Sequence, residues 1–137
     1  MKKKTLKMVS NLFSFKTIKD EYDNEYVVFK RSPINHIDDI VDKTQFEAIE
    51  NHIHLFDKVK QRDVEELSSI GKNIGKALLY TLNAFYPQKR FVVYVTITVG
   101  DSMIIRFHQK WDGEPLYYED IESLRSRDEV IFEFTTS

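Results

Sequence analysis

Apolar and polar side chains alternate from Phe91 to Trp111 on both sides of the tripeptide Gly100-Asp101-Ser102, a pattern that predicts a long antiparallel β-hairpin. Successive side chains of a strand point to opposite faces, so one face of this hairpin should be apolar. If both apolar sets share that face, the loop must hold an odd number of residues, and the tripeptide is the shortest solution. The expected apolar face consists of Phe91, Val93, Val95, Ile97, Val99, Met103, Ile105, Phe107 and Trp111, with Gln109 as a polar exception.

The second face of this hairpin carries the one constellation with catalytic character. The register places Thr96 opposite Arg106 and Tyr94 opposite His108. A metal-independent ribonuclease needs a proton-transfer group with a pKa near neutrality and a cation that stabilises the phosphorane, and Tyr94, Arg106 and His108 are of these types. Cross-strand pairs of the same kind are also ordinary on a sheet surface. A small metal-independent ribonuclease is therefore the alternative function.

Residues 44–60 carry apolar side chains three and four positions apart, which is the spacing of an amphipathic helix. Thr44 and Glu47 stand at capping-box spacing, so the helix should begin near Thr44 and end near residue 60. His52 and His54 would then point about 200° apart and are not expected to share a metal ion. The apolar positions are Phe46, Ile49, Ile53 and Phe56.

A second, longer helix is predicted over residues 64–85, and Pro87 ends it. Asp63 and Glu66 repeat the capping-box spacing at its start. Gly71 and Gly75 in its centre each cost about 1 kcal/mol relative to alanine, so we expect the sheet or the other helix to approach closely there. The apolar side would consist of Val64, Leu67, Ile70, Ile74, Leu78, Leu82 and Phe85.

Shorter patterns complete the predicted fold. They indicate an edge strand at 25–31, a loop at 33–42, a turn at Asp112-Gly113, a strand at 115–119, one or two helical turns at 120–127 and a last strand at 130–135. Residues 1–137 should then form a single domain of the α+β class. We expect a mostly antiparallel sheet of four to five strands with two main helices packed on one face.

Composition excludes several kinds of chemistry. The chain has no cysteine, which excludes disulfides, thiolate metal sites and thiol catalysis and favours a cytoplasmic protein. Hydrophobic residues make up 42% of the chain and aromatic residues 13%, enough for a packed core. Polar residues interrupt positions 1–15, so no signal peptide is expected, and no stretch reaches the roughly 18 apolar residues of a membrane span.

Charge is distributed unevenly although the net charge is only −2. The basic N-terminal segment, residues 1–19, holds six lysines and no acid, whereas residues 111–137 hold eight acids and two arginines. The overall acidity opposes nucleic-acid binding, and the acidic C-terminal region suits a basic protein partner. Docking of the basic segment on an acidic neighbouring copy would instead give a homodimer, which is a further alternative.

A cluster of aromatic and acidic side chains surrounds the Asp112-Gly113 turn. Tyrosine and tryptophan bury a large surface at low entropic cost, and adjacent carboxylates attract a basic partner, so we predict a protein contact surface here. By register Trp111 belongs to the apolar face, and its place in the core or in the contact surface stays open. The predicted partner-binding residues are Trp111, Asp112, Glu114, Tyr117, Tyr118, Glu119, Asp120 and Glu122.

The run from Ile104 to Tyr118 (IIRFHQKWDGEPLYY) stands in a small, acidic, cysteine-free chain with a capped helix and a hairpin. It resembles the small α+β immunity proteins that accompany bacterial polymorphic toxins. The resemblance covers the C-terminal half and implies a non-enzymatic inhibitor, or antitoxin, that occludes a cognate toxin, often a basic nuclease. From the residues themselves we expect no cofactor, no metal ion and no membrane or nucleic-acid partner. Residues 1–19 match no part of this pattern.

Overall fold

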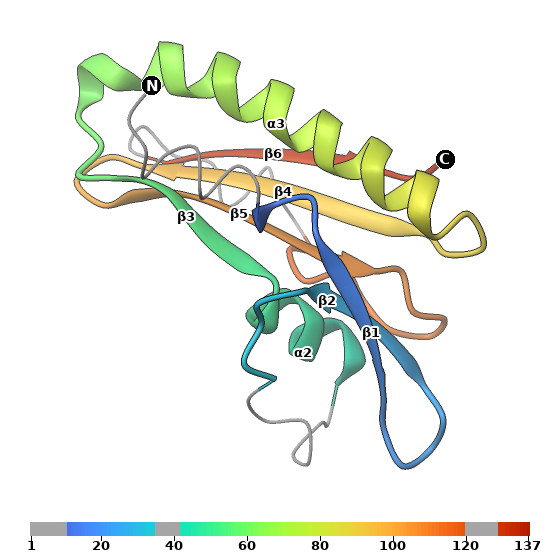
Figure 1. The fold of residues 1–137 in the computed structure, drawn as a ribbon. Helices are drawn as coiled ribbons and strands as arrows, with labels where there is room; N and C mark the ends of the chain where they lie inside the picture. The colour runs from blue at the N-terminus through green and yellow to red at the C-terminus, as the bar shows by residue number, and fades with distance from the viewer. Residues whose placement is uncertain (1–10, 35–41, 120–128) are drawn as a thin grey trace.

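The computed structural model describes residues 11–34, 42–119 and 129–137, which form an α+β fold with two α-helices and two antiparallel sheets. The predicted fold class is therefore confirmed. In chain order (Figure 1) the elements are β1 (Phe15–Lys19), β2 (Glu25–Phe29), α2 (Lys43–Glu50), β3 (His52–Asp57), a 3₁₀ turn (Gln61–Asp63), α3 (Val64–Phe85), β4 (Phe91–Thr98), β5 (Ser102–Gln109) and β6 (Glu129–Thr135).

The larger sheet has four strands in the order β3-β5-β4-β6, and every neighbouring pair is antiparallel. β1 and β2 form a separate two-stranded sheet. The longer helix α3 lies along one side of the four-stranded sheet, whereas α2 lies on the other side and contacts β5 and β2 (Figure 1). We expected both helices to pack on one face of the sheet, but only α3 does so. The other helix, α2, packs against β2, where its Phe46 ring lies 5.1 Å from the Tyr26 ring, measured between ring centroids.

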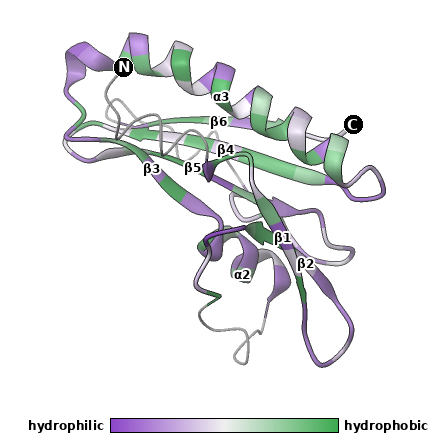
Figure 2. Ribbon diagram, in the orientation of Figure 1, coloured by the Kyte–Doolittle hydropathy of each residue, from purple (hydrophilic) through white to green (hydrophobic). Residues whose placement is uncertain are grey.

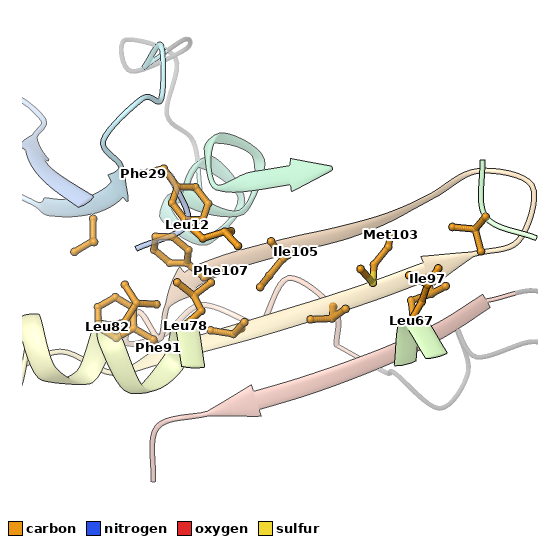
Figure 3. Packing of buried hydrophobic residues seen from close by; sticks show 14 residues of the cluster. Leu12, Phe29, Leu67, Leu78, Leu82, Phe91, Ile97, Met103, Ile105 and Phe107 are labelled. Atoms are coloured by element: carbon orange, nitrogen blue, oxygen red, sulfur yellow. The ribbon is translucent and has the colours of Figure 1, made fainter. Parts of the chain in front are cut away.

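The main core lies between α3 and the four-stranded sheet. Leu78 and Leu82 of α3 pack near Phe91, and Leu67 packs near Ile97 towards the other end of the helix (Figure 3). The strands beneath α3 are largely hydrophobic, while α3 alternates between hydrophobic and hydrophilic bands (Figure 2). The predicted apolar face of the hairpin is confirmed for its buried members Phe91, Val93, Val95, Ile97, Met103, Ile105 and Phe107.

The hairpin of β4 and β5 has the predicted faces but a different register. Tyr94 is paired with Arg106 rather than with His108, and Thr96 is paired with Ile104 rather than with Arg106. The pairing differs from the predicted one by two residues. Since side chains repeat with a period of two, this difference leaves the paired residues of β4 and β5 on the faces that were predicted for them, whereas Val99 lies in the loop.

The turn explains this register. The loop has three residues, as predicted, but they are Val99 to Asp101, so Gly100 stands at the centre. Gly100 has φ +85°, a left-handed conformation that only glycine adopts without a steric cost. The turn therefore closes one residue earlier than the sequence pattern suggested.

The first predicted helix is shorter than expected, because α2 ends at Glu50 and the edge strand β3 follows it. Asn51 leaves the helical conformation at φ −101° and ψ 55°. Its buried side chain accepts a hydrogen bond from Phe29 N (3.0 Å) and donates one to Val27 O (2.9 Å). One side chain thus satisfies two backbone groups of β2, and the helix ends where this contact is made.

The start of α2 also differs from the prediction. Asp42 is the N-cap, and its carboxylate accepts a hydrogen bond from Gln45 N (3.0 Å). Thr44 and Glu47 form no capping box, because the Thr44 hydroxyl donates to Glu114 and the Glu47 side chain is fully buried. The capping-box spacing therefore predicted the first turn of α2 correctly, but not the residue that caps it.

The second predicted helix has the expected length as α3. Ile70 and Phe85, which were assigned to its apolar side, are 42% and 64% exposed. Its predicted capping box is absent: the Asp63 carboxylate instead accepts a hydrogen bond from Lys60 N (2.9 Å) in the preceding 3₁₀ turn. The buried residues are Leu67, Gly71, Gly75, Leu78 and Leu82.

The close approach predicted at the two central glycines of α3 is confirmed. A β-carbon at Gly71 would lie 2.9 Å from Val95 Cγ1, and one at Gly75 would lie 2.5 Å from Phe134 Cε2. Real β-carbons do not approach other heavy atoms so closely. The two glycines therefore let α3 rest directly on β4 and β6.

The remaining strands agree with the pattern in part. The predicted strand at 25–31 appears as β2, but its partner β1 has no counterpart among the predicted elements. The last predicted strand is confirmed as β6, which pairs with β4. The strand predicted at 115–119 is absent, since these residues follow an irregular course. The helical turns predicted at 120–127 and most of the loop predicted at 33–42 lie outside the described residues.

Candidate functional site

The predicted contact surface begins where β5 ends. We call residues 111–119 the acidic segment; it has no regular secondary structure and follows Lys110, whose backbone N–H still donates to Arg90 O (2.8 Å). An irregular segment on a protein surface is mobile unless its polar groups find partners in the fold. The geometry of the site therefore depends on what holds these nine residues in place.

The first anchor is Trp111. Its ring packs 5.4 Å from the Tyr26 ring in a small second core, and its indole Nε1 donates to Glu47 Oε1 (2.7 Å). The side chain is partly buried. Trp111 joins the cluster beside β2 and α2, not the main core beneath α3.

Glu47 is the centre of this anchor. The carboxylate is fully buried and accepts four hydrogen bonds, from Val27 N (3.0 Å), Gln109 N (2.8 Å), Gln109 Nε2 (2.7 Å) and Trp111 Nε1 (2.7 Å). These donors come from β2, β5 and the acidic segment, while Glu47 itself belongs to α2. One carboxylate therefore ties four parts of the fold together.

Burial raises the pKa of the Glu47 carboxyl to about 7, against the lowering effect of the hydrogen bonds from Gln109, Val27 and Trp111. Each oxygen accepts two N–H groups, and a protonated oxygen would have to give up one of these donors. The four donors thus match the ionised carboxylate. The pKa is nevertheless raised, because burial removes the charge from water.

The second anchor is Glu114, which binds the start of α2. Glu114 Oε1 accepts hydrogen bonds from Thr44 N and Thr44 Oγ1, both at 2.7 Å, and Oε2 accepts one from Lys43 N at 3.3 Å. The Lys43 ammonium lies 3.3 Å from the same carboxylate and 5.3 Å from the centre of the Trp111 ring. An acid from a distant segment therefore takes the backbone donors that a helix start leaves unpaired.

These contacts govern the ionisation of Glu114. Partial burial alone would raise its pKa, but the hydrogen bonds from Thr44 and Lys43, together with an interaction with Asp42, lower it to about 2. The carboxylate is consequently ionised wherever the protein is folded at ordinary pH.

The third anchor contains the residues considered for catalysis. The Tyr94 hydroxyl lies 3.1 Å from His108 Nε2, so the predicted pair does meet, although diagonally and not as cross-strand partners. Tyr117 N also donates to Nε2 (3.3 Å), and His108 Nδ1 lies 2.7 Å from Gln109 O. These contacts require a neutral imidazole with its proton on Nδ1.

Burial shapes the chemistry of this group. Neither Tyr94 nor His108 has exposed surface. Burial lowers the pKa of His108 and raises the pKa of Tyr94 above its usual range. Both groups therefore stay neutral near pH 7, and they hold the backbone of Tyr117 on the sheet.

Arg106, the proposed cation, also acts within the fold. Its Nη1 donates to Ala48 O in the last turn of α2 (2.9 Å), where the carbonyls of a helix lack partners. Its guanidinium lies 4.9 Å from the centre of the Tyr117 ring and 6.0 Å from that of Tyr118. The acidic segment thus covers Arg106 with two rings.

The eight predicted contact residues fall into three groups. Asp112 and Glu119 are exposed and have no ion-pair partner among the described residues. Asp120 and Glu122 lie outside the described residues. The partly buried ones contact other parts of the chain; they are Trp111, Glu114, Tyr117 and Tyr118.

Sequence reasoning did not identify Glu47 and Asn51, the two buried polar residues that organise this region. Glu47 was assigned to a capping box, although it directly follows Phe46, the first apolar position of the helix. Asn51 lies inside the helix that the sequence predicts over residues 44–60. The partners of Glu47 on β2 and β5 are distant in sequence, so no local pattern marks this carboxylate as buried.

His52 and His54 lie on β3 rather than on a helix, so the reason given against a metal pair was wrong. Their rings share one face of the strand, with centroids 5.7 Å apart, and both side chains are exposed. His52 Nδ1 lies 2.6 Å from Ile49 O at the end of α2. In the part of the chain that the structure describes, no three histidine, aspartate or glutamate side chains come together as a metal site would require.

Comparison with models of protein families, with curated protein sequences and with solved structures finds no match to this chain. Among residues 11–34, 42–119 and 129–137, no helix has the length and apolar character that a membrane crossing demands.

Proposed function

We propose that this chain is a non-enzymatic protein-binding inhibitor of the immunity-protein type, which acts in the cytoplasm by covering a functional surface of a cognate basic toxin. The observation that carries the proposal is the anchoring of the acidic segment. Three sets of hydrogen bonds, at Glu47, Glu114 and His108, hold it against α2 and the sheet. The exposed acids Asp112 and Glu119 are not used by these anchors.

Anchoring favours a binding role for a thermodynamic reason. A loop that must order itself on binding loses conformational entropy at that moment, and this cost weakens the complex. A segment that is already fixed in the free protein does not lose this entropy on binding. Carboxylates held in fixed positions also raise the rate at which an oppositely charged protein associates. A fixed acidic surface therefore suits fast and tight binding of a basic protein.

The ribonuclease alternative has no support from the geometry. General acid–base catalysis requires a side chain within hydrogen-bond reach of the substrate. Tyr94 and His108 are buried beneath the acidic segment, and the hydrogen-bonding nitrogens of His108 are occupied by protein groups. Arg106 is similarly engaged by Ala48 and by the two tyrosine rings.

Affinity capture with the full chain tests the proposal. The wild-type protein should retain a basic protein from its native host, and the double variant Asp112→Lys, Glu119→Lys should retain at least about tenfold less of it. The matched control is Asp57→Lys, Asp101→Lys, which reverses two exposed acids at the opposite end of β5. Equal loss in both variants, or no loss in either, would contradict the proposed contact surface.

A further inference from the structure

A groove separates the acidic segment from the start of α2. Its volume is about 250 Å³, and its walls include Asp42 and Gln45 on the helix side and Pro115, Tyr117 and Glu119 on the segment side. Both walls are fixed, since Glu114 ties the segment to Thr44 and the His108 ring holds Tyr117 N. The groove is thus a built feature of the fold and not a gap between mobile parts.

The electrostatic character of the groove is negative. A helix start normally presents a partial positive charge, but the backbone N–H groups of Lys43, Thr44 and Gln45 already have carboxylate acceptors. Asp42 and Glu119 are the charged side chains in the walls of the groove as the structure describes them. Lys43, which follows Asp42 in the chain, is paired with Glu114. An excess of negative charge therefore faces the space.

The same region already binds two of the chain's own cations with the same kinds of side chain. The Lys43 ammonium lies between the Glu114 carboxylate (3.3 Å) and the Trp111 ring (5.3 Å). The Arg106 guanidinium lies 4.9 Å from the Tyr117 ring. Carboxylates and aromatic rings at these distances stabilise cations through charge and through the ring quadrupole. The groove combines these elements, with Tyr117 in one wall and carboxylates on both sides.

We propose that the groove is the receptor for an arginine side chain of the basic partner. A guanidinium is planar and weakly hydrated, so it can lie against the Pro115 and Tyr117 wall while its N–H groups reach the carboxylates of Asp42 and Glu119. A lysine ammonium is a compact, strongly hydrated charge and would gain less from that wall. This inference rests on the proposed function for the origin of the arginine, but the groove can be tested by itself.

Nuclear magnetic resonance titration of the full-length protein supplies that test. The probe is the tripeptide N-acetyl-Gly-Arg-Gly-amide, and the uncharged control replaces arginine with citrulline, which has nearly the same shape. The arginine peptide should shift the backbone amides of Gln45, Tyr117 and Glu119 in a saturable way, with a dissociation constant on the order of millimolar, as befits one side chain. The citrulline peptide should bind roughly tenfold more weakly or not at all.

Two conservative variants link the binding to the groove. In Asp42→Asn, Glu119→Gln the helix cap is retained, because asparagine caps as well as aspartate, but both charges in the walls are lost. The affinity for the arginine peptide should fall roughly fivefold or more. The matched control Asp57→Asn, Asp101→Asn removes two exposed acids that do not line the groove and should bind like the wild type.

The outcomes separate this inference from the proposed function. Equal shifts with citrulline, shifts dispersed over the acidic surface, or unchanged affinity in Asp42→Asn, Glu119→Gln would overturn the arginine receptor. If the peptide binds the groove as expected while capture retains no basic partner, the receptor stands and the inhibitor proposal fails. If capture succeeds while the peptide produces no saturable shift, the inhibitor proposal stands and the receptor fails.

Discussion

At the scale of single residues, the fold depends on polar side chains that are buried and fully paired. Glu47 and Asn51 lie four positions apart in the sequence. Together they bind backbone groups of β2 and β5 and the indole of Trp111. A buried charged group whose hydrogen bonds are all made holds its partners in fixed positions. Removing one of these partners lowers the stability of the fold. The position of the acidic segment is therefore decided by residues outside it.

Replacing Glu47 with glutamine tests this dependence. The amide offers one acceptor oxygen where the carboxylate had two, and its NH₂ group would face the N–H donors, so at least one donor would lose its partner. The free energy of unfolding should fall by about 2 kcal/mol, measured by urea denaturation. The control Glu66→Gln, at an exposed position of α3, should change it by less than about 0.5 kcal/mol. A similar small change at both sites would show that the hydrogen bonds of Glu47 are not important.

The raised pKa of Glu47 also gives a pH dependence. Between its usual value near 4.5 and the folded value of about 7, the folded protein holds a proton that the unfolded chain releases. The contribution of Glu47 to stability is therefore greatest below pH 4.5 and declines as the pH rises to 7, by up to about 3 kcal/mol. The stability of the wild type relative to Glu47→Gln should be greater at pH 5 than at pH 7.5. An advantage that grows with pH would contradict the raised pKa.

At the scale of elements, the sequence predicts what depends on periodicity. The faces of the β4–β5 hairpin follow from alternation, α3 follows from its apolar spacing, and the contact at its glycines follows from their cost in a helix. The register of the hairpin depends on the backbone angle of Gly100. The end of α2 depends on the contact between Asn51 and β2. Contacts between distant segments decide these features, and no local pattern contains them.

The glycine contact of α3 yields a prediction at this scale. Alanine at position 75 improves helix propensity by about 1 kcal/mol, but its methyl group would lie 2.5 Å from Phe134 and 3.2 Å from Val95. Overpacking should dominate, so Gly75→Ala should lower the free energy of unfolding by about 1–3 kcal/mol. Asn73→Ala, at an exposed position of the same helix, should be neutral or slightly stabilising. Stabilisation by both substitutions would argue against direct packing of α3 on the sheet.

Glu114 predicts how the acidic segment and α2 are coupled. Glu114→Ala removes the acceptor for Thr44 N and Lys43 N, a loss comparable to that of a helix cap, and should cost about 1 kcal/mol. Hydrogen–deuterium exchange should become faster at the Thr44 amide and along residues 115–119, while the amides of β4 stay protected. Unchanged exchange in the segment would show that Glu114 does not anchor it.

At the scale of the whole molecule, the acidic and aromatic side chains of the acidic segment have two different roles. Trp111, Glu114 and Tyr117 fasten the segment to the fold, and Asp112 and Glu119 stay exposed. The cluster was visible in the sequence, but this division was not, because it depends on α2 and β5 lying beneath the segment. The residues considered for catalysis serve the same anchoring.

This assignment predicts the outcome of a nuclease assay. Incubation of the purified protein with structured RNA in EDTA should give no cleavage above that of a buffer control. His108→Ala should leave this result unchanged and should lower the free energy of unfolding, because it removes the acceptor for Tyr117 N and Tyr94 OH. Cleavage that disappears in His108→Ala would instead establish the ribonuclease.

The most direct test of the central claim is hydrogen–deuterium exchange of the full chain, alone and in complex with the basic partner that it captures. We predict measurable protection of residues 111–119 in the free protein and further slowing there, and at the start of α2, in the complex. Unprotected exchange of this segment in the free protein, or slowing confined to another surface such as the exposed side of α3, would contradict the claim that an anchored acidic segment binds the partner.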